Sequence, residues 1–183
     1  MPQFMAVLTE TGKQRFASAA ISGQSVGFLT MAVGDGGGTV PAPENMTGLI
    51  NERFRAALNR VVIADQSANV IRAEMIIQPQ AGGFWIREAA LYGDDGACLA
   101  VASVPPSYKP LLAEGSGRLQ AVNLWIAVSS TADVKLMTDP SVILATLSEL
   151  NRARDDAKDY ADEVAGELDA SLKTLISEAV SEA

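Results

Sequence analysis

The last 43 residues of the chain constrain its architecture more than any other segment. Residues 141–183 contain no proline, one glycine, ten acidic side chains and four basic ones, whereas all eight prolines and fourteen of the fifteen glycines precede them. Within this segment a stripe of mainly apolar residues recurs in steps of three or four with a mean of 3.6, the period of an α-helix. The stripe comprises Ile143, Leu147, Leu150, Arg154, Ala157, Ala161, Val164, Leu168, Leu172, Leu175 and Ala179. The pattern predicts one helix over 141–183, with Asp139 as its N-cap and Pro140 at its first position.

Such a helix would be about 65 Å long, too long to pack along its whole length on the 140 residues before it. The stripe therefore predicts a coiled-coil stalk built from identical helices, although it does not determine their number. The residues expected at the seam are Leu147, Leu150, Val164, Leu168, Leu172 and Leu175. Two successive steps of four, from Val164 to Leu172, would relax a left-handed supercoil locally. The alternative is a solvated acidic helix that frays, because Arg154, Ala157 and Ala161 thin the middle of the stripe.

Residues 1–140 predict a separate α+β head domain with an antiparallel sheet, and residues 141–183 the stalk. Strands are expected at 4–8, 26–33, 71–77, 84–92, 97–104, 122–128 and 134–137, and helices at 10–20 and 46–59. Asp94-Asp95-Gly96 separates two strands as a hairpin turn, and short turns of this kind favour antiparallel pairing. Residues 105–117 are expected to form a long loop.

The composition excludes several classes of chemistry. The chain has no histidine and a single cysteine, Cys98, and its formal net charge is −8. These counts remove Ser-His-Asp triads, histidine-liganded zinc and the basic surface typical of nucleic-acid binding. The glycine cluster 34–38 lacks the residues of a phosphate-binding loop, and no apolar run approaches the roughly 18 residues of a membrane span. The sequence therefore predicts no enzyme, no cofactor, no metal site, no nucleic-acid partner and no membrane insertion.

The aromatic residues leave two interpretations open. Trp85 and Trp125, like Phe84, are most simply residues of the core or of a sheet face, but exposed rings would support a carbohydrate-binding or glycan-active module. Tyr108 stands in a proline-rich segment, where it can either contact a partner or staple the chain locally.

Four blocks of sequence, in order, resemble one known family. They are Met31-Ala32-Val33-Gly34-Asp35-Gly36-Gly37-Gly38; Leu49-Ile50-Asn51-Glu52 with Arg55 and Leu58-Asn59; Gly82-Gly83-Phe84-Trp85-Ile86-Arg87-Glu88 with Leu91-Tyr92; and Ser107-Tyr108-Lys109-Pro110 with Glu114-Gly115-Ser116-Gly117-Arg118. Together they resemble the N-terminal domain of tail fibres of contractile-tailed bacteriophages and R-type pyocins, over about residues 4–150.

The resemblance implies a virion structural protein at the periphery of the tail baseplate, assembled in the cytoplasm of the bacterial host. It implies a homotrimeric fibre whose N-terminal domain attaches to baseplate proteins and whose distal part adsorbs to the host. Tyr108, Lys109 and Arg118 are the candidate inter-subunit or baseplate contacts. Because the sequence stops within the stalk, it is expected to be either a fragment of a longer fibre or an adaptor for a second fibre protein. A coiled-coil scaffold unrelated to virions would explain the stalk but not the four blocks.

Overall fold

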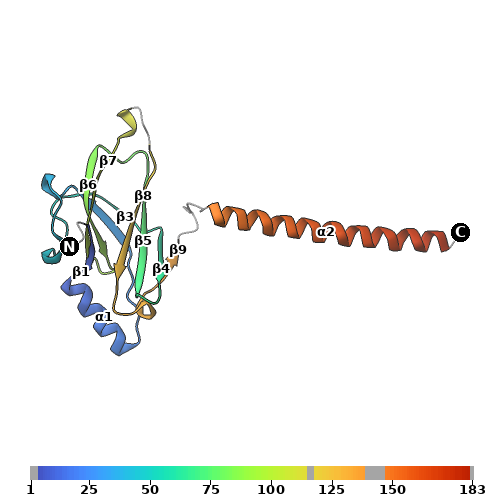
Figure 1. The fold of residues 1–183 in the computed structure, drawn as a ribbon, viewed down its shortest axis with the longest axis horizontal. Helices are drawn as coiled ribbons and strands as arrows, with labels where there is room; N and C mark the ends of the chain where they lie inside the picture. Colours follow the sequence, from blue (N-terminus) through green and yellow to red (C-terminus); the bar gives the residue numbers. More distant parts are fainter. Residues whose placement is uncertain (1–3, 115–117, 139–146, 182–183) are drawn as a thin grey trace. The chain divides into compact units, whose positions relative to one another are not determined.

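The computed structural model describes residues 4–114, 118–138 and 147–181 (Figure 1). The chain divides into two compact units, Met1–Val142 and Ile143–Ala183. The first unit, called the head below, holds two antiparallel sheets and a helix, and the second holds the C-terminal helix α2 (Leu147–Ser181). The predicted α+β class, with antiparallel pairing and a C-terminal helix, is confirmed for the described residues.

The described part of the head contains one α-helix, nine strands and four short 3-10 helices. The α-helix and the strands are β1 (Ala6–Leu8), α1 (Glu10–Ser22), β2 (Thr30–Gly34), β3 (Glu52–Ala57), β4 (Arg60–Asp65), β5 (Val70–Ile77), β6 (Phe84–Tyr92), β7 (Cys98–Lys109), β8 (Gln120–Ala127) and β9 (Met137–Thr138). A five-stranded sheet has the order β1-β7-β6-β2-β3 and a four-stranded sheet the order β8-β5-β4-β9. Figure 1 shows α1 across one end of the sheets.

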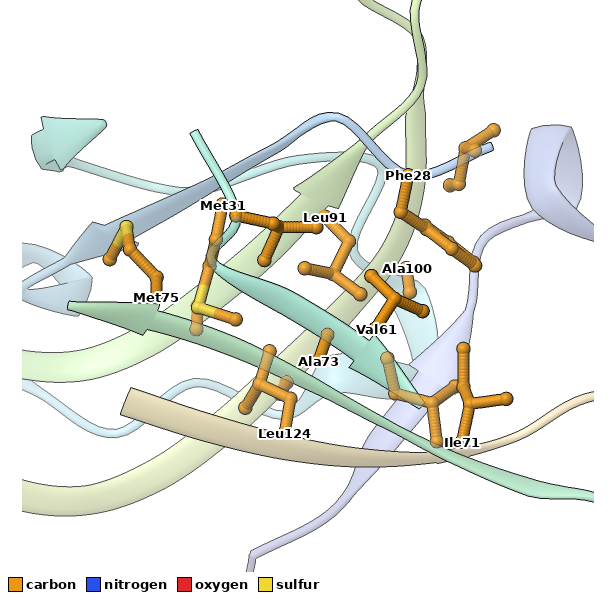
Figure 2. Close-up of a cluster of buried hydrophobic side chains, with 14 of the residues drawn as sticks. Phe28, Met31, Val61, Ile71, Ala73, Met75, Leu91, Ala100 and Leu124 are labelled. Atoms are coloured by element: carbon orange, nitrogen blue, oxygen red, sulfur yellow. The ribbon is translucent and has the colours of Figure 1, made fainter. Parts of the chain in front are cut away.

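The main core lies between the two sheets. On β5, alternate residues Ile71, Ala73, Met75 and Ile77 are completely buried, as the period of two predicts for one face of a strand. Figure 2 shows members of this cluster from both sheets, including Leu91 of β6. A smaller cluster on the outer face of the five-stranded sheet contains Ala32, Ala90, Tyr92 and Val101.

Helix α1 begins and ends with standard capping interactions. The Thr9 side-chain oxygen accepts a hydrogen bond from the Gly12 N–H at 3.0 Å, which satisfies a donor that lacks a partner within the helix. Gly23 ends the helix in the left-handed conformation, with φ of 69°, and donates to the Ala19 carbonyl. Phe16 and Ala19 are the apolar side chains that α1 buries in the main core.

The predicted helix over 46–59 is wrong, because this segment forms strand β3 and the turn that leads to it. β3 pairs antiparallel with β2, from Thr30 opposite Ala57 to Gly34 opposite Glu52. The apolar residues of this segment resemble one face of a helix in the sequence, but in the structure they belong to two different clusters. Met46 and Leu49 pack on the outer-face cluster. Phe54 and Ala56 pack against the main core.

Two further segments differ from the prediction. Residues 105–109 are the end of strand β7 rather than part of a loop, since Ser107, Tyr108 and Lys109 pair with Ile86, Trp85 and Phe84. Pro105 and Pro106 fall where the register of this pair shifts, a place where a missing N–H donor is tolerated. Strand β4, which pairs with β5 and β9, was missing from the prediction, although its residues 61–63 are all β-branched.

Candidate interaction surfaces

Glu88 on β6 is the point where three of the four sequence blocks meet. Its side chain is completely buried, and its carboxylate accepts three backbone hydrogen bonds. Oε1 accepts from the N–H groups of Gly36, at 3.1 Å, and Asn51, at 2.9 Å. Oε2 accepts from the Ile50 N–H at 2.9 Å. The carboxylate therefore fastens the glycine-rich turn and the segment before β3 onto β6.

This arrangement explains the glycine at position 34. A β-carbon on Gly34 would collide with the Glu88 carboxylate and with the Asn51 carbonyl. Burying a carboxylate is costly unless hydrogen bonds replace its hydration, and here backbone amides supply them. The geometry of the site thus depends on a close approach that a side chain at position 34 would block.

Asp35 adds a second layer of contacts above Glu88. Its Oδ1 accepts from the Gly37 N–H at 3.0 Å and from the Asn51 side-chain amide at 2.9 Å. The Arg87 guanidinium donates to the Asp35 carbonyl at 3.3 Å, and Arg53 Nε lies 3.7 Å from Asp35 Oδ2. The turn is consequently held by side chains from both sides, and the side chain of Ile50, in the neighbouring segment before β3, is 60% exposed.

Trp85 and Tyr108 form an exposed aromatic pair at the end of the β6–β7 hairpin. They are direct cross-strand partners, with ring centroids 5.5 Å apart and planes inclined at 53°. The guanidinium of Arg87 lies 5.1 Å from the Trp85 ring centroid. The Trp85 and Tyr108 side chains remain 45% and 40% exposed. Tyr108 therefore contacts a neighbour in its own chain and also offers a surface to a partner.

Lys109, the next residue, turns in the opposite direction. Its side chain is completely buried, and Nζ donates to the Pro110 carbonyl at 3.4 Å. Burial, with a smaller contribution from the charge of Arg118, lowers the pKa of the Lys109 ammonium. Arg118 is exposed. Of the three residues predicted as contacts, Tyr108 and Arg118 reach the surface of the head.

The sequence did not single out a cluster around Arg55 on β3. Arg55 binds the Glu52 carboxylate through Nε at 2.9 Å and a terminal nitrogen at 2.6 Å, and it lies 3.8 Å above the Tyr92 ring centroid. Beside it, burial raises the pKa of the Cys98 thiol to about 11. Cys98 is half-buried, and the raised pKa keeps its thiol protonated at neutral pH.

Helix α2 displays its apolar stripe to solvent within this single chain. Val164, Leu168, Leu172 and Leu175 are 45%, 62%, 49% and 61% exposed. Leu147 and Leu150 belong to the helix, but their side chains lie outside the described residues, as does the expected cap at 139–140.

Two exposed residues of α2 escaped the sequence prediction. Tyr160 and Ile176, which are 69% and 62% exposed, extend the steps of four through Val164, Leu168 and Leu172 in both directions. Continuing the spacing of four beyond Val164 and Leu172 leads to both residues.

No group of three or more cysteine, aspartate or glutamate side chains in the described parts of the chain is arranged to hold a metal ion. No described helix is both long and apolar enough to cross a membrane.

Comparison with known proteins assigns the family. Residues 1–148 match the family model of the phage tail-collar fibre protein, N-terminal. The chain is 48% identical over 146 residues to a "Probable tail fiber protein" of Escherichia phage P2, a match that covers 79% of this chain and 22% of that protein. The chain thus spans about a fifth of the length of this relative. No solved structure gives a significant match. Both matches confirm the resemblance carried by the four blocks. The chain belongs to the phage tail-collar fibre family, and its residues 1–148 match the N-terminal domain of that family.

Proposed function

We propose that this chain is the tail-proximal part of a homotrimeric fibre. In this proposal the head attaches to the baseplate of the virion tail, and α2 forms a coiled-coil stalk with two other copies. The stalk carries a distal segment, either of the same fibre or of a second fibre protein, that adsorbs to the host. The chain has a structural role without catalysis and assembles in the host cytoplasm.

The exposed stripe on α2 is the observation that carries the trimeric part. Leaving four large apolar side chains between 45% and 62% exposed is unfavourable for a lone helix in water. The helix has 35 residues and a length of about 52 Å. Identical helices would supply a matching stripe against which these side chains can pack.

Sedimentation equilibrium of the full chain at micromolar concentration tests the trimer. We expect three times the mass of the chain, and Leu168→Asp should shift the mass towards that of a monomer because it places a charge in the seam. Ser177→Asp is the matched control, since nine residues of helix place it on the opposite face from Leu168. A wild-type chain that sediments as a monomer would refute the stalk.

The proposal of baseplate attachment is based on exposed side chains of the head that belong to the family's sequence blocks. Ile50 and the Trp85–Tyr108 pair lie on the outer side of the five-stranded sheet, above or beside the Glu88 site. Aromatic and arginine side chains are enriched at the energetic centres of protein interfaces. Tyr108 and Arg118 remain the predicted contacts, whereas the buried Lys109 supports the strand beneath them.

Binding of the fluorescently labelled chain to purified phage tails that lack fibres tests this attachment. Ile50→Asp and Tyr108→Ala should each weaken binding about tenfold. Ile21→Asp is the control, because Ile21 is 90% exposed at the end of α1. Equal affinities for all variants would place the attachment surface elsewhere.

The glycan-binding alternative receives no support from the family assignment. Trp85, Tyr108 and Trp125 are exposed, as that alternative required. However, exposed rings are equally suited to protein contacts, and the tail-fibre family explains the whole head.

A further inference from the structure

Strand β3 forms an open edge of the five-stranded sheet. In the described part of the chain it ends the strand order β1-β7-β6-β2-β3 and pairs with β2 on one side. Four of its six residues are exposed, and the other two, Phe54 and Ala56, are half-buried. The strand begins two residues after the exposed Ile50 of the proposed attachment surface. An edge strand of this kind offers backbone N–H and C=O groups with which another strand can pair.

The hydrogen bonds around β3 show which of its backbone groups face the open edge. The Leu58 N–H donates to the Leu29 carbonyl at 3.0 Å, on the side of β2. The Asn59 N–H donates to the Glu74 carbonyl at 2.8 Å, on the other side. Because the backbone groups of a strand alternate between its two sides, the even-numbered residues at the end of β3 pair with β2. The N–H and C=O groups of Arg55 therefore face the open edge.

A hollow of about 450 Å³ borders the first half of β3. Its lining includes Phe54 of β3 together with Phe84 and Leu111, which come from other segments. The Phe54 and Phe84 rings are stacked, with centroids 6.3 Å apart. In paired strands, residues directly opposite each other point to the same face of the sheet. A residue opposite Phe54 on an added strand would thus point towards the hollow, which can take an apolar side chain.

We propose that an extended segment of a tail protein adds to the five-stranded sheet beside β3. The main chain of this segment pairs with the backbone of Arg55, and one of its apolar side chains enters the hollow beside Phe54. In this mode of recognition, backbone hydrogen bonds supply affinity and pockets for alternate side chains supply specificity. The inference rests on the baseplate attachment proposed above and states how the partner is held.

The charges of β3 favour a different protein over a second copy of this chain. Two β3 strands paired antiparallel would be related by a twofold axis, which the proposed trimer lacks. Centred on Arg55, such a pair would place the Arg55 side chains of both copies opposite each other, which is unfavourable for like charges. The Arg53 side chain is 44% exposed. An acidic side chain on the added segment would compensate its charge, so we expect the tail protein to supply one.

Binding of the labelled full-length chain to purified tails that lack fibres tests the backbone contact. Arg55→Pro removes the N–H that faces the open edge, at a position where strands tolerate proline. Arg55→Ala is the matched control, since it removes the same side chain and keeps the N–H. We expect Arg55→Pro to bind about tenfold more weakly than Arg55→Ala, as the loss of one hydrogen bond predicts. Equal affinities of the two variants, with folding checked by thermal unfolding, would overturn the strand addition.

Hydrogen exchange of the wild-type chain gives a second measurement, which holds even if Arg55→Pro does not fold. Mass spectrometry with fragmentation resolves the Arg55 amide, with and without bound tails. We expect this amide to exchange about tenfold more slowly in the tail-bound chain. An unchanged rate would overturn the strand addition and leave the attachment intact, provided that Ile50→Asp still weakens binding.

Two other outcomes concern the identity of the partner. Slow exchange at Arg55 in the chain without tails would assign the open edge to a second copy and would also overturn the proposal. A wild-type chain that does not bind the tails would overturn both the strand addition and the baseplate attachment.

Discussion

At the scale of single residues, the head depends on a charge that it has removed from water. Glu88 is a carboxylate with no exposed surface, and three backbone N–H groups from two separate segments replace its hydration. A glutamate side chain in a strand ordinarily marks a solvent-facing position. Here it organises the loops that carry the family's sequence blocks.

Glu88→Gln should destabilise the head by about 3 kcal/mol, because the amide group of glutamine would place a donor against a backbone donor in a buried site. Urea unfolding followed by tryptophan fluorescence measures this loss. Glu52→Gln is the control, since the Glu52–Arg55 pair is partly exposed and should contribute less than about 1 kcal/mol. Similar losses for both variants would contradict the structural role of Glu88.

The Cys98 thiol should react slowly with maleimide in the folded chain. Burial raises its pKa from an ordinary value of 9.0 to about 11, so at pH 8 the folded chain holds roughly 100-fold less thiolate than the unfolded chain. The folded-state rate should then rise with pH through the range from 8 to 11. Stopped-time labelling followed by mass spectrometry, with and without denaturant, provides the measurement. Equal rates in both states would show that the thiol is accessible and ionised.

The sequence predicted some residue environments and missed others for a physical reason. The burial of Ile71, Ala73 and Met75 followed from their alternation along one expected strand. The burial of Glu88 could not be predicted in this way, because its partners Gly36 and Ile50 are 52 and 38 residues away. Local patterns report local surroundings, whereas a hydrogen-bond network is set by the pairing of distant strands.

At the scale of elements, α1 could be predicted from a local pattern, whereas β3 depends on pairing with a distant strand. Helix α1 was correctly expected, since its Thr9 cap and its apolar face are encoded within one short segment. Strand β3 was mistaken for a helix because Ile50, Phe54 and Leu58 recur at the helical spacing of four. In the structure, Leu49 and Phe54 pack on opposite sides of the sheet. The pairing of β3 with β2 outweighs the local pattern.

Gly12→Ala should destabilise the contact between α1 and β7 by about 2–3 kcal/mol. A β-carbon at position 12 would collide with the Leu99 backbone carbonyl, which outweighs the better helix propensity of alanine. Gly48→Ala is the control, because no atom lies within 4 Å of its β-carbon. Thermal unfolding monitored by fluorescence should show a lower midpoint for the first variant, and equal midpoints would refute the close approach.

At the scale of the whole molecule, the chain joins two units that differ in how far they bury their apolar side chains. The head buries an apolar core of its own, whereas α2 exposes its largest apolar side chains. The stability of the head is therefore expected to depend mainly on its own sequence, and that of α2 on the concentration of the chain.

Two spectroscopic probes should separate these units, since both tryptophans lie in the head. We expect a thermal transition in circular dichroism at 222 nm that moves to higher temperature as the chain concentration rises. The fluorescence transition of Trp85 and Trp125 should shift much less over the same range. A single transition, coincident in both signals at every concentration, would contradict two separately stabilised units.

The Glu88 site has a consequence for virion assembly. The turn at Gly36 and the segment at Ile50 both donate to the Glu88 carboxylate, so these hydrogen bonds form only when β6 is in place. A partly folded head consequently cannot display the proposed attachment surface, even if its individual segments are present. Because the buried carboxylate receives these hydrogen bonds only in the folded head, defective fibres would fail to dock instead of occupying a position on the tail.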